Sequence, residues 1–251
     1  MTITKSMTID CHYTEGGALA GGNGIVVNDS LSGTPNTAVV FLRGLDIFGV
    51  NPPSNGVRFI SGAALYVDDS VIRRFNAANS QGISFQPAGA AKLYVTNTVI
   101  ADNGNGATGG GILIQPTGTG TAKVTLSHVR VFNNANVGIR VDSTSNTGTG
   151  NQVTLSDSQV DGNASGVSLV VPVGASQGVL FVDDSQIVNN TGIGLSANGS
   201  AAFMVVGKTL ITGNGTGVSL AGGATGNTYG DNGLDFNGVN GAFTAPVAPR
   251  K

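Results

Sequence analysis

Short runs in which apolar and polar residues alternate recur along the whole chain, always in the same order. One copy begins at residues 65–72 and continues at residues 82–85, and the next occupies residues 93–100 and 111–114. A period of two places alternate side chains on one face of a strand, so these runs predict β-strands that share one interior. No run shows an apolar i, i+3, i+4 stripe of useful length, and few helices are therefore expected.

The copies return at nearly even intervals. Their second apolar anchor stands at Ile47, Ile72, Ile100, Val131, Val160, Ile187 and Ile211. These positions differ by 25, 28, 31, 29, 27 and 24 residues, and a degenerate copy opens the chain at residues 3–9 and 24–27. Three short strands per copy fit a coil that winds once and stacks on the next, with like strands paired in parallel about 4.8 Å apart. The sequence thus predicts an all-β fold, a single-stranded right-handed parallel β-helix (solenoid) of about eight coils.

Other all-β architectures fit this pattern less well. A propeller blade needs about 40–45 residues and four strands, and a calcium-binding nonapeptide solenoid needs repeated Gly-Gly-x-Gly-x-Asp. Residues 21–24 match only an isolated fragment of the latter. The uneven intervals argue against a hexapeptide solenoid. A β-sandwich stays open as an alternative, although it gives no reason for identical coil signatures.

Stacking the coils converts alignment columns into rows of side chains. One inward row is mostly hydroxyl-bearing: Ser70, Thr98, Val129, Ser158, Ser185 and Thr209. A second row, three residues after each anchor, is Asn103, Asn134, Asn163, Asn190 and Asn214. Asparagine accepts the left-handed backbone of a sharp turn, and its amide can bond to the backbone and to its copy one coil away. Both rows are interpreted as structural. Asn51 and Asn76 stand one residue late, so the asparagine ladder is expected to begin imperfectly.

The pattern Ser-x-Ile-x-x-Asn-x-x-Gly-Ile-x-Phe resembles the right-handed parallel β-helix repeats of the pectate-lyase-like superfamily. The resemblance covers roughly residues 3–220, and it is greatest to uncharacterised secreted bacterial β-helix repeat proteins, including the ending at residues 228–232. It implies the fold and a secreted habit. It implies no single activity, because this fold hosts lyases, hydrolases, adhesins and phage spikes.

Composition narrows the class of protein further. The 251 residues include 40 glycines, 12 basic and 14 acidic residues and one cysteine, and the net charge is −2. A hydrophobic fraction of 40% argues against disorder, and the near-zero charge argues against a nucleic-acid partner. No apolar run is long enough for a membrane span. Because residues 1–4 already read as strand, we expect that a natural leader precedes Met1. The secreted habit that the resemblance implies leads us to expect an extracellular or periplasmic protein.

The acidic residues do not compose a recognisable catalytic or metal site. In the resembled lyases, acidic residues hold calcium beside an Arg or Lys base, but the pairs Asp68-Asp69 and Asp183-Asp184 lie four coils apart, about 19 Å. The resembled polygalacturonases carry four motifs on successive coils, of which Asp68-Asp69 matches only one. Asp68 and Asp69 are adjacent in sequence, so their side chains are expected to diverge.

Nucleophilic and cofactor chemistry are no better supported. A Ser-His-Asp triad would have to use His12 or His128, the only two histidines of the chain. Cys11 and His12 are neighbours in a run of strand and should face opposite ways. Residues 104–109 match a dinucleotide-binding loop but precede a strand instead of a helix. No catalytic residue, metal ligand or cofactor is therefore predicted.

One surface row is a candidate binding site. Phe41, Tyr66 and Tyr94 are predicted to point outward from the first strand of consecutive coils, with Lys92 and Lys123 along one edge. Aromatic faces flanked by cations suit a sugar ring or an acidic polysaccharide. The alternatives are that the aromatic residues stabilise the sheet or lie beneath the C-terminal tail.

These observations define a two-part organisation and a leading hypothesis. Residues 1–221 are expected to form the solenoid, and residues 222–251 a partial coil that caps it, with a tail. Any ligand is expected at the variable loops that join third to first strands. The leading hypothesis is a non-catalytic exported protein that binds polysaccharide, cell-surface glycan or matrix, or has a surface-structural role. A lyase or hydrolase with an unrecognised site and a trimeric spike or adhesin fragment are the alternatives, and the oligomeric state, monomer or trimer, stays open.

Overall fold

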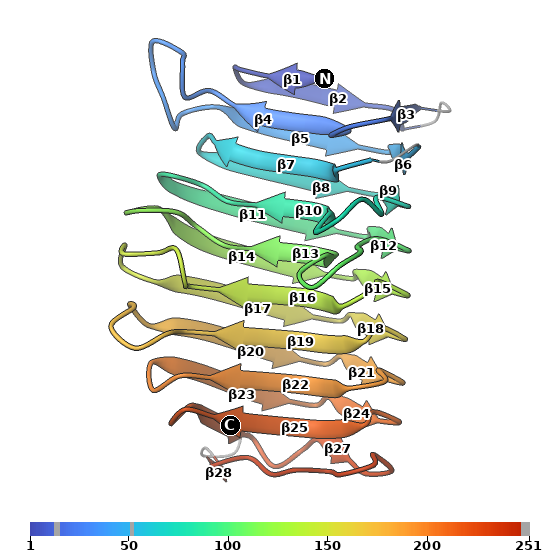
Figure 1. Cartoon of the computed structure of the whole chain (residues 1–251), viewed down its shortest axis with the longest axis vertical. Helices are drawn as coiled ribbons and strands as arrows, with labels where there is room; N and C mark the ends of the chain where they lie inside the picture. The colour runs from blue at the N-terminus through green and yellow to red at the C-terminus, as the bar shows by residue number, and fades with distance from the viewer. Residues whose placement is uncertain (13–15, 51–52, 247–251) are drawn as a thin grey trace.

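The computed structural model describes residues 1–12, 16–50 and 53–246, and every regular element among them is a β-strand (Figure 1). The first sheet contains β1 (Thr2–Ile3), β4 (Ile25–Asn28), β7 (Asn55–Ser61), β10 (Gln81–Phe85), β13 (Gly110–Ile114), β16 (Val137–Asp142), β19 (Ser165–Val170), β22 (Ile193–Asn198) and β25 (Thr216–Ala221). We call it sheet A.

Sheet B contains β2 (Met7–Asp10), β5 (Val39–Arg43), β8 (Ala64–Asp68), β11 (Ala90–Thr96), β14 (Thr121–Ser127), β17 (Asn151–Ser156), β20 (Gly178–Asp183), β23 (Ala202–Gly207), β26 (Thr225–Thr228) and β28 (Ala245–Pro246). Sheet C contains β3 (Gly17–Ala20), β6 (Asp46–Gly49), β9 (Val71–Arg73), β12 (Val99–Ala101), β15 (Arg130–Phe132), β18 (Gln159–Asp161), β21 (Gln186–Val188), β24 (Leu210–Thr212) and β27 (Gly233–Leu234).

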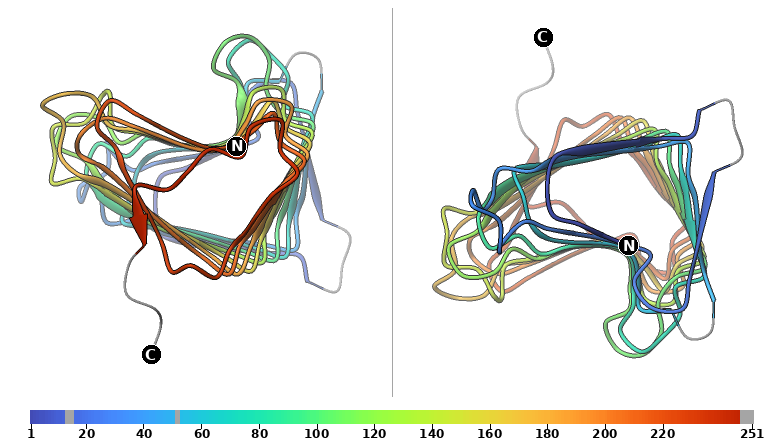
Figure 2. Two further views of the ribbon diagram at one scale, coloured as in Figure 1. Left: turned by 90° about the horizontal axis from the view of Figure 1, so that it is seen from below. Right: turned by 90° about the horizontal axis from the view of Figure 1, so that it is seen from above.

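The chain visits sheets B, C and A in turn and then repeats the circuit, so strands as far as β27 pair in parallel with the strand three places along the chain, and β28 pairs with β26. Seen along the long axis, the successive circuits superimpose around one interior (Figure 2). The anchors pair in the predicted register, Ile72 with Ile100 and Ile100 with Val131, for example. The predicted parallel β-helix of three-stranded coils is confirmed, and its handedness stays a prediction.

The interior is filled by the inward-facing residues of all three sheets. Leu65, Ile72 and Ile83, from the three strands of one coil, are fully buried, and the equivalent positions of the neighbouring coils continue the same core. Because each coil covers the apolar side chains of the next, burial along the stack is the main stabilising contribution to the fold.

The predicted asparagine ladder is present and is completely buried. The Oδ1 atom of Asn163 accepts hydrogen bonds from the backbone N–H and the side-chain amide of Asn134, at 2.9 and 3.0 Å, and the same pair of bonds links Asn103 to Asn134. The ladder continues beyond the last predicted member, since Asn214 donates in the same way to Asn237. The side-chain amides also donate to backbone carbonyl groups where the chain leaves sheet C; the amide of Asn134, for example, donates to the carbonyl oxygens of Ile100 and Phe132.

A column of glycines faces the ladder. A Cβ atom built on Gly82 would lie 2.9 Å from Nδ2 of Asn103 and 2.8 Å from the carbonyl oxygen of Gly111, and the glycines of the following coils are equally confined. A side chain here would therefore collide with the ladder and with the backbone of the next coil. This close approach explains why glycine follows the asparagine in each repeat.

The ladder begins imperfectly, as predicted, but for a different reason. The ladder position of the coil before Asn103 is occupied by Phe75, whose backbone N–H donates to Oδ1 of Asn103 at 3.1 Å. Phe75 is fully buried and lies against the column at Gly24 and Gly56. Asn76 is exposed, and Asn51 lies outside the described residues.

The hydroxyl row is also buried, and its hydroxyl groups link neighbouring coils by accepting hydrogen bonds from backbone N–H groups. The Ser185 hydroxyl accepts a bond from the N–H of Ser158, whose own hydroxyl accepts from the N–H of Val129.

At the C-terminal end of the solenoid, β26 and β27 extend sheets B and C, and β28 pairs with β26 through Asn227 and Thr228. The two ends of the described chain lie at opposite ends of the stack (Figure 1).

Candidate functional site

The predicted aromatic row lies on the outer face of sheet B. Register pairs Phe41 with Tyr66 and Tyr66 with Tyr94, and the row continues through Thr125 and Thr154. The ring centroids of Phe41 and Tyr66 are 4.3 Å apart, and those of Tyr66 and Tyr94 are 4.6 Å apart. We call these three residues the aromatic stack.

The rings lie face to face along the stack, at interplanar angles of 13° and 10°. The sequence interpretation assumed a flat strip of aromatic faces, whereas the structure shows that the inner faces cover one another. A sugar ring can therefore stack only at an end of the row. The end at Tyr94 borders Thr125, whose short side chain cannot cover a whole ring. Part of the energy of the stack is structural, because cross-strand aromatic pairs stabilise a sheet.

Lys92 and Lys123 lie beside the open end of the stack. They are register partners on β11 and β14, both are exposed, and no ion pair to either is present among the described residues. Like charges directly opposite each other destabilise a pair of strands. A hollow of about 250 Å³ adjoins Lys123 and is lined by polar groups that include Thr149, Gln152 and Gln177. It lies at the edge where the loops from sheet A enter sheet B, the edge at which a ligand was expected.

The described C-terminal residues do not cover this surface. Strand β28 pairs with β26, at the end of sheet B, and β14, β17, β20 and β23 separate β26 from Tyr94 on β11. The tail of the remaining alternative, residues 247–251, lies outside the described residues, so that alternative stays open.

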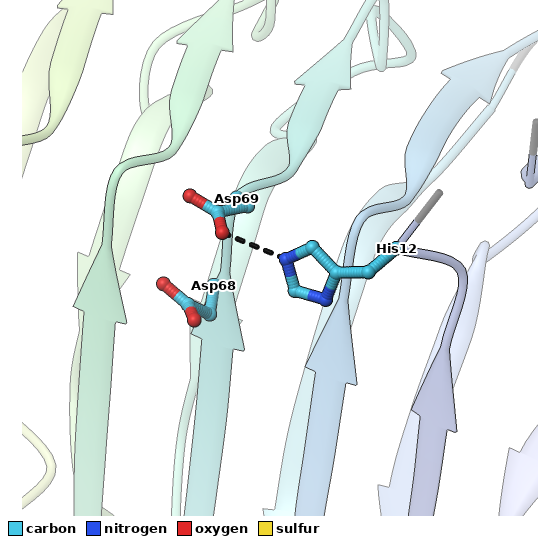
Figure 3. Close-up of side chains that lie close together, drawn as sticks. All are labelled: His12, Asp68 and Asp69. Carbon is cyan, nitrogen blue, oxygen red and sulfur yellow. Dashed lines mark hydrogen bonds and ion pairs between the residues drawn. The ribbon is translucent and has the colours of Figure 1, made fainter. Parts of the chain in front are cut away.

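A second group of side chains, which the sequence analysis missed, lies where sheet B turns toward sheet C (Figure 3). The His12 Nε2 atom is 2.7 Å from Oδ2 of Asp69, and its Nδ1 atom is 2.9 Å from Oδ1 of Asp10. An oxygen of Asp68 completes a set of three ligand-type atoms, with His12 and Asp69, that all lie within 4.8 Å of one another. We call His12, Asp68 and Asp69 the histidine cluster. The expectation that Asp68 and Asp69 diverge is wrong, because one oxygen of each approaches the same imidazole.

The local backbone explains how His12 reaches Asp69 across an intervening coil. Strand register aligns Asp10 with Arg43 and Arg43 with Asp68, so the coil between them turns at Gly44. Gly44 has φ +64° and lies so close to Cys11 and His12 that a Cβ would be 2.9 Å from their backbone atoms. With no side chain in the middle coil, the imidazole of the first coil extends to the carboxylate of the third.

Hydrogen bonding sets the protonation of this group. The bonds with the carboxylates of Asp69 and Asp10, in that order, raise the pKa of His12. The backbone N–H and the ring of His12 lower the pKa of Asp10. Asp68 has other partners as well: its Oδ1 accepts from the Thr96 hydroxyl at 2.6 Å, and its Oδ2 is 3.9 Å from Nε of Arg43.

A third acidic group, at Asp29, is structural. Its carboxylate is fully buried and accepts the backbone N–H groups of Asn36, Thr37 and Ala38 at 2.8–2.9 Å, together with the Ser61 hydroxyl. Burial alone would raise the pKa of Asp29, but these hydrogen bonds outweigh burial and lower it. The carboxylate thus fastens the loop between β4 and β5 to β7.

The other acidic, glycine-rich and histidine positions considered in the sequence do not form a further site among the described residues. Asp68 and Asp183 end strands β8 and β20, four steps apart in sheet B, and do not share a site. The glycine-rich segment 104–109 leads into strand β13, so it does not open a dinucleotide-binding helix. His128 bonds to the Ser127 hydroxyl at 2.9 Å.

Comparison with known proteins gives no indication of what these surfaces bind. No family model matches the chain, and neither a curated protein nor a solved structure matches it. Within the described residues, no helix has the length and apolar character that crossing a bilayer would require. The class that the fold defines is a parallel β-solenoid.

Proposed function

We propose that this solenoid is an exported, non-catalytic glycan-binding protein that holds acidic polysaccharide on the outer face of sheet B. The site is centred on Lys92 and Lys123, with Tyr94 at the open end of the aromatic stack. The observation that carries the proposal is the pairing of two exposed lysines in register beside that ring.

The charge arrangement supports an anionic ligand. Two adjacent ammonium groups repel each other, and a carboxylate lying between them would relieve that repulsion. Their spacing follows the stack, so a polymer running along the solenoid axis could present successive acidic groups to successive coils. Exposed charges are screened by salt, and binding should weaken as ionic strength rises.

The neighbouring surface supports a sugar in particular. The outer row changes from Tyr94 to the short residues Thr125 and Thr154, and this change leaves room for a sugar ring against the free face of Tyr94. The polar hollow beside Lys123 offers amide and hydroxyl groups for the hydroxyl groups of a sugar. An amphipathic ring, a pair of cations and polar edges are the groups that recognise acidic saccharides.

The test is retention on gels that contain polygalacturonate, alginate or a neutral glucan. We expect retention by an acidic polysaccharide at low salt, with an affinity about tenfold lower in the double variant Lys92→Ala/Lys123→Ala. Tyr94→Ala should weaken binding, and Tyr94→Phe should preserve it because the ring remains. The charge-matched control is Arg58→Ala/Arg130→Ala, which removes two cations from sheets A and C.

Three results would overturn the proposal. Equal retention of the wild type and the lysine variant would remove the site from sheet B. Failure to bind any acidic polysaccharide would leave a structural role. Release of soluble products, assayed with calcium and then with chelator, would show catalysis and contradict the non-catalytic part.

A further inference from the structure

The histidine cluster combines groups that a purely structural contact does not need. An imidazole and two carboxylates come from two coils and converge at the surface, with side-chain exposures of 29% for His12 and 44% for Asp69 (Figure 3). The solenoid continues through this corner elsewhere with single residues such as Asn97 or Asp157, which occupy the same left-handed turn. At this corner an imidazole from the first coil is added to the carboxylates of the third.

We propose that His12, Asp69 and Asp68 form a binding site for a first-row transition-metal dication, with Zn²⁺ as the reference ion. The ligand atoms are Nε2 of His12 and one carboxylate oxygen from each aspartate. This site is separate from the glycan surface proposed above, and neither proposal depends on the other.

The distances suit an ion of this size after small side-chain movements. Zinc–nitrogen and zinc–oxygen bonds of about 2.0–2.2 Å at a tetrahedral angle place two ligand atoms about 3.3 Å apart. Nε2 of His12 and Oδ2 of Asp69 are now 2.7 Å apart, and the third oxygen lies within 4.8 Å. The first pair has to open slightly and the Asp68 oxygen has to move inward, both within the reach of exposed side chains.

Asp10 prepares His12 for this role. It accepts a bond from Nδ1 at 2.9 Å, and its Oδ1 atom also accepts the backbone N–H of His12, so the ring is held at a fixed angle. Because Nδ1 is engaged by Asp10, Nε2 is the ring nitrogen that is left to bind a metal, and it points to Asp69. A carboxylate on the far nitrogen is the usual outer partner of a metal-binding histidine.

The donor set selects among cations. One imidazole nitrogen with two carboxylate oxygens suits zinc, nickel or cobalt, whereas calcium and magnesium prefer oxygen donors alone and more of them. Three protein ligands leave a coordination position for water. A metal ion that binds Nε2 displaces any proton on that nitrogen to solvent, so binding should weaken in acid. The guanidinium of Arg43, near Asp68, opposes the added positive charge.

The test is calorimetric titration of the tag-free full chain with Zn²⁺, Ni²⁺ and Ca²⁺ at pH 7.5. We expect one Zn²⁺ per chain, at least tenfold weaker binding in His12→Gln and in Asp69→Asn, and calcium binding that does not depend on His12. His128→Gln is the matched control, because it removes the other histidine from the same corner of a different coil and should bind like the wild type.

A second measurement separates the metal site from a simple ion pair. Zn²⁺ should raise the unfolding midpoint of the wild type and of His128→Gln but not that of His12→Gln, and circular dichroism establishes that each variant is folded. Co²⁺ should give visible d–d absorption that disappears in His12→Gln. Equal Zn²⁺ affinity in the wild type and His12→Gln, or no saturable binding at millimolar Zn²⁺, would overturn the proposal and leave a histidine–aspartate ion pair.

Discussion

The first three coils and the later coils share one backbone plan but are held together by different side chains. From Asn103 to Asn237 the corner after sheet C is filled by one repeated amide ladder, and the same two hydrogen bonds recur at every step. In the first coils the same corner contains Phe75. Separate contacts link these coils to one another: the hydrogen bonds of the buried Asp29 carboxylate, the histidine cluster and an Arg73–Asp46 ion pair at 2.7 Å. A repeat can thus keep its backbone spacing while its cross-coil chemistry changes.

This difference predicts which region of the solenoid changes in stability with salt and pH. Buried amide bonds hardly respond to salt or pH, whereas carboxylates, imidazole and guanidinium groups do. Because coils contact only their neighbours, each region can lose stability by itself. The following predictions test whether the two regions behave as separate units.

The largest effect is expected at Phe75. Replacing Phe75 with alanine empties a fully buried site beside Gly24 and Gly56 and should lower the free energy of unfolding by about 4 kcal/mol. Urea unfolding measures the loss, and hydrogen exchange should accelerate in β4 to β10 well before β19 to β25. Uniform acceleration along the whole chain would show that the two regions unfold together.

A smaller effect is expected in the middle of the ladder. Asn163→Ala removes the acceptor of two buried bonds from Asn134 and the donor to Val131 and Asn190, so the free energy of unfolding should fall by about 2–3 kcal/mol. Exchange should now accelerate first in β15 to β22. A change below about 0.5 kcal/mol would mean that the ladder contributes little to stability.

The smallest effect is the pH dependence of stability that Asp29 gives to the first coils. Asp29 has a lowered pKa in the folded state, so unfolding takes up a proton in acid and its contribution to stability is lost as pH falls below about 4. Asp29→Asn lacks that carboxylate, and the difference in urea midpoint between the variant and the wild type should narrow from pH 7 to pH 3. A constant difference across this range would mean that the Asp29 carboxylate does not titrate differently in the two states.

The repeat made most of the fold predictable. Regular alternation in residues 65–72 and 93–100 determined the strands, the register and which side chains face inward, because one interior serves every coil. The ladder followed from a fixed three-residue offset between Ile100 and Asn103. Phe75 was harder to place, since a phenylalanine among asparagines matches the row by position and not by residue type.

The site was less predictable, because it depends on departures from the repeat. The contact of His12 with Asp69 needs a degenerate first coil and a glycine at position 44, and neither stands out in the alignment of copies. Aligning Asp10 with Arg43 and Asp68 would have been the available signal. The aromatic row was found correctly, but ring orientation depends on side-chain packing that alternation does not encode.

The glycine column has a consequence for how such a molecule can change length. Each glycine faces the asparagine and the carbonyl group of the coil that follows, so any coil with both residues fits on any other. Removing residues 157–183 would bring Gly138 against Asn190 in the contact that it now makes with Asn163. Removing half of that segment would leave a glycine without its asparagine. Duplication or loss of DNA can therefore lengthen or shorten the solenoid only by whole coils, so its length changes in steps of one coil during evolution.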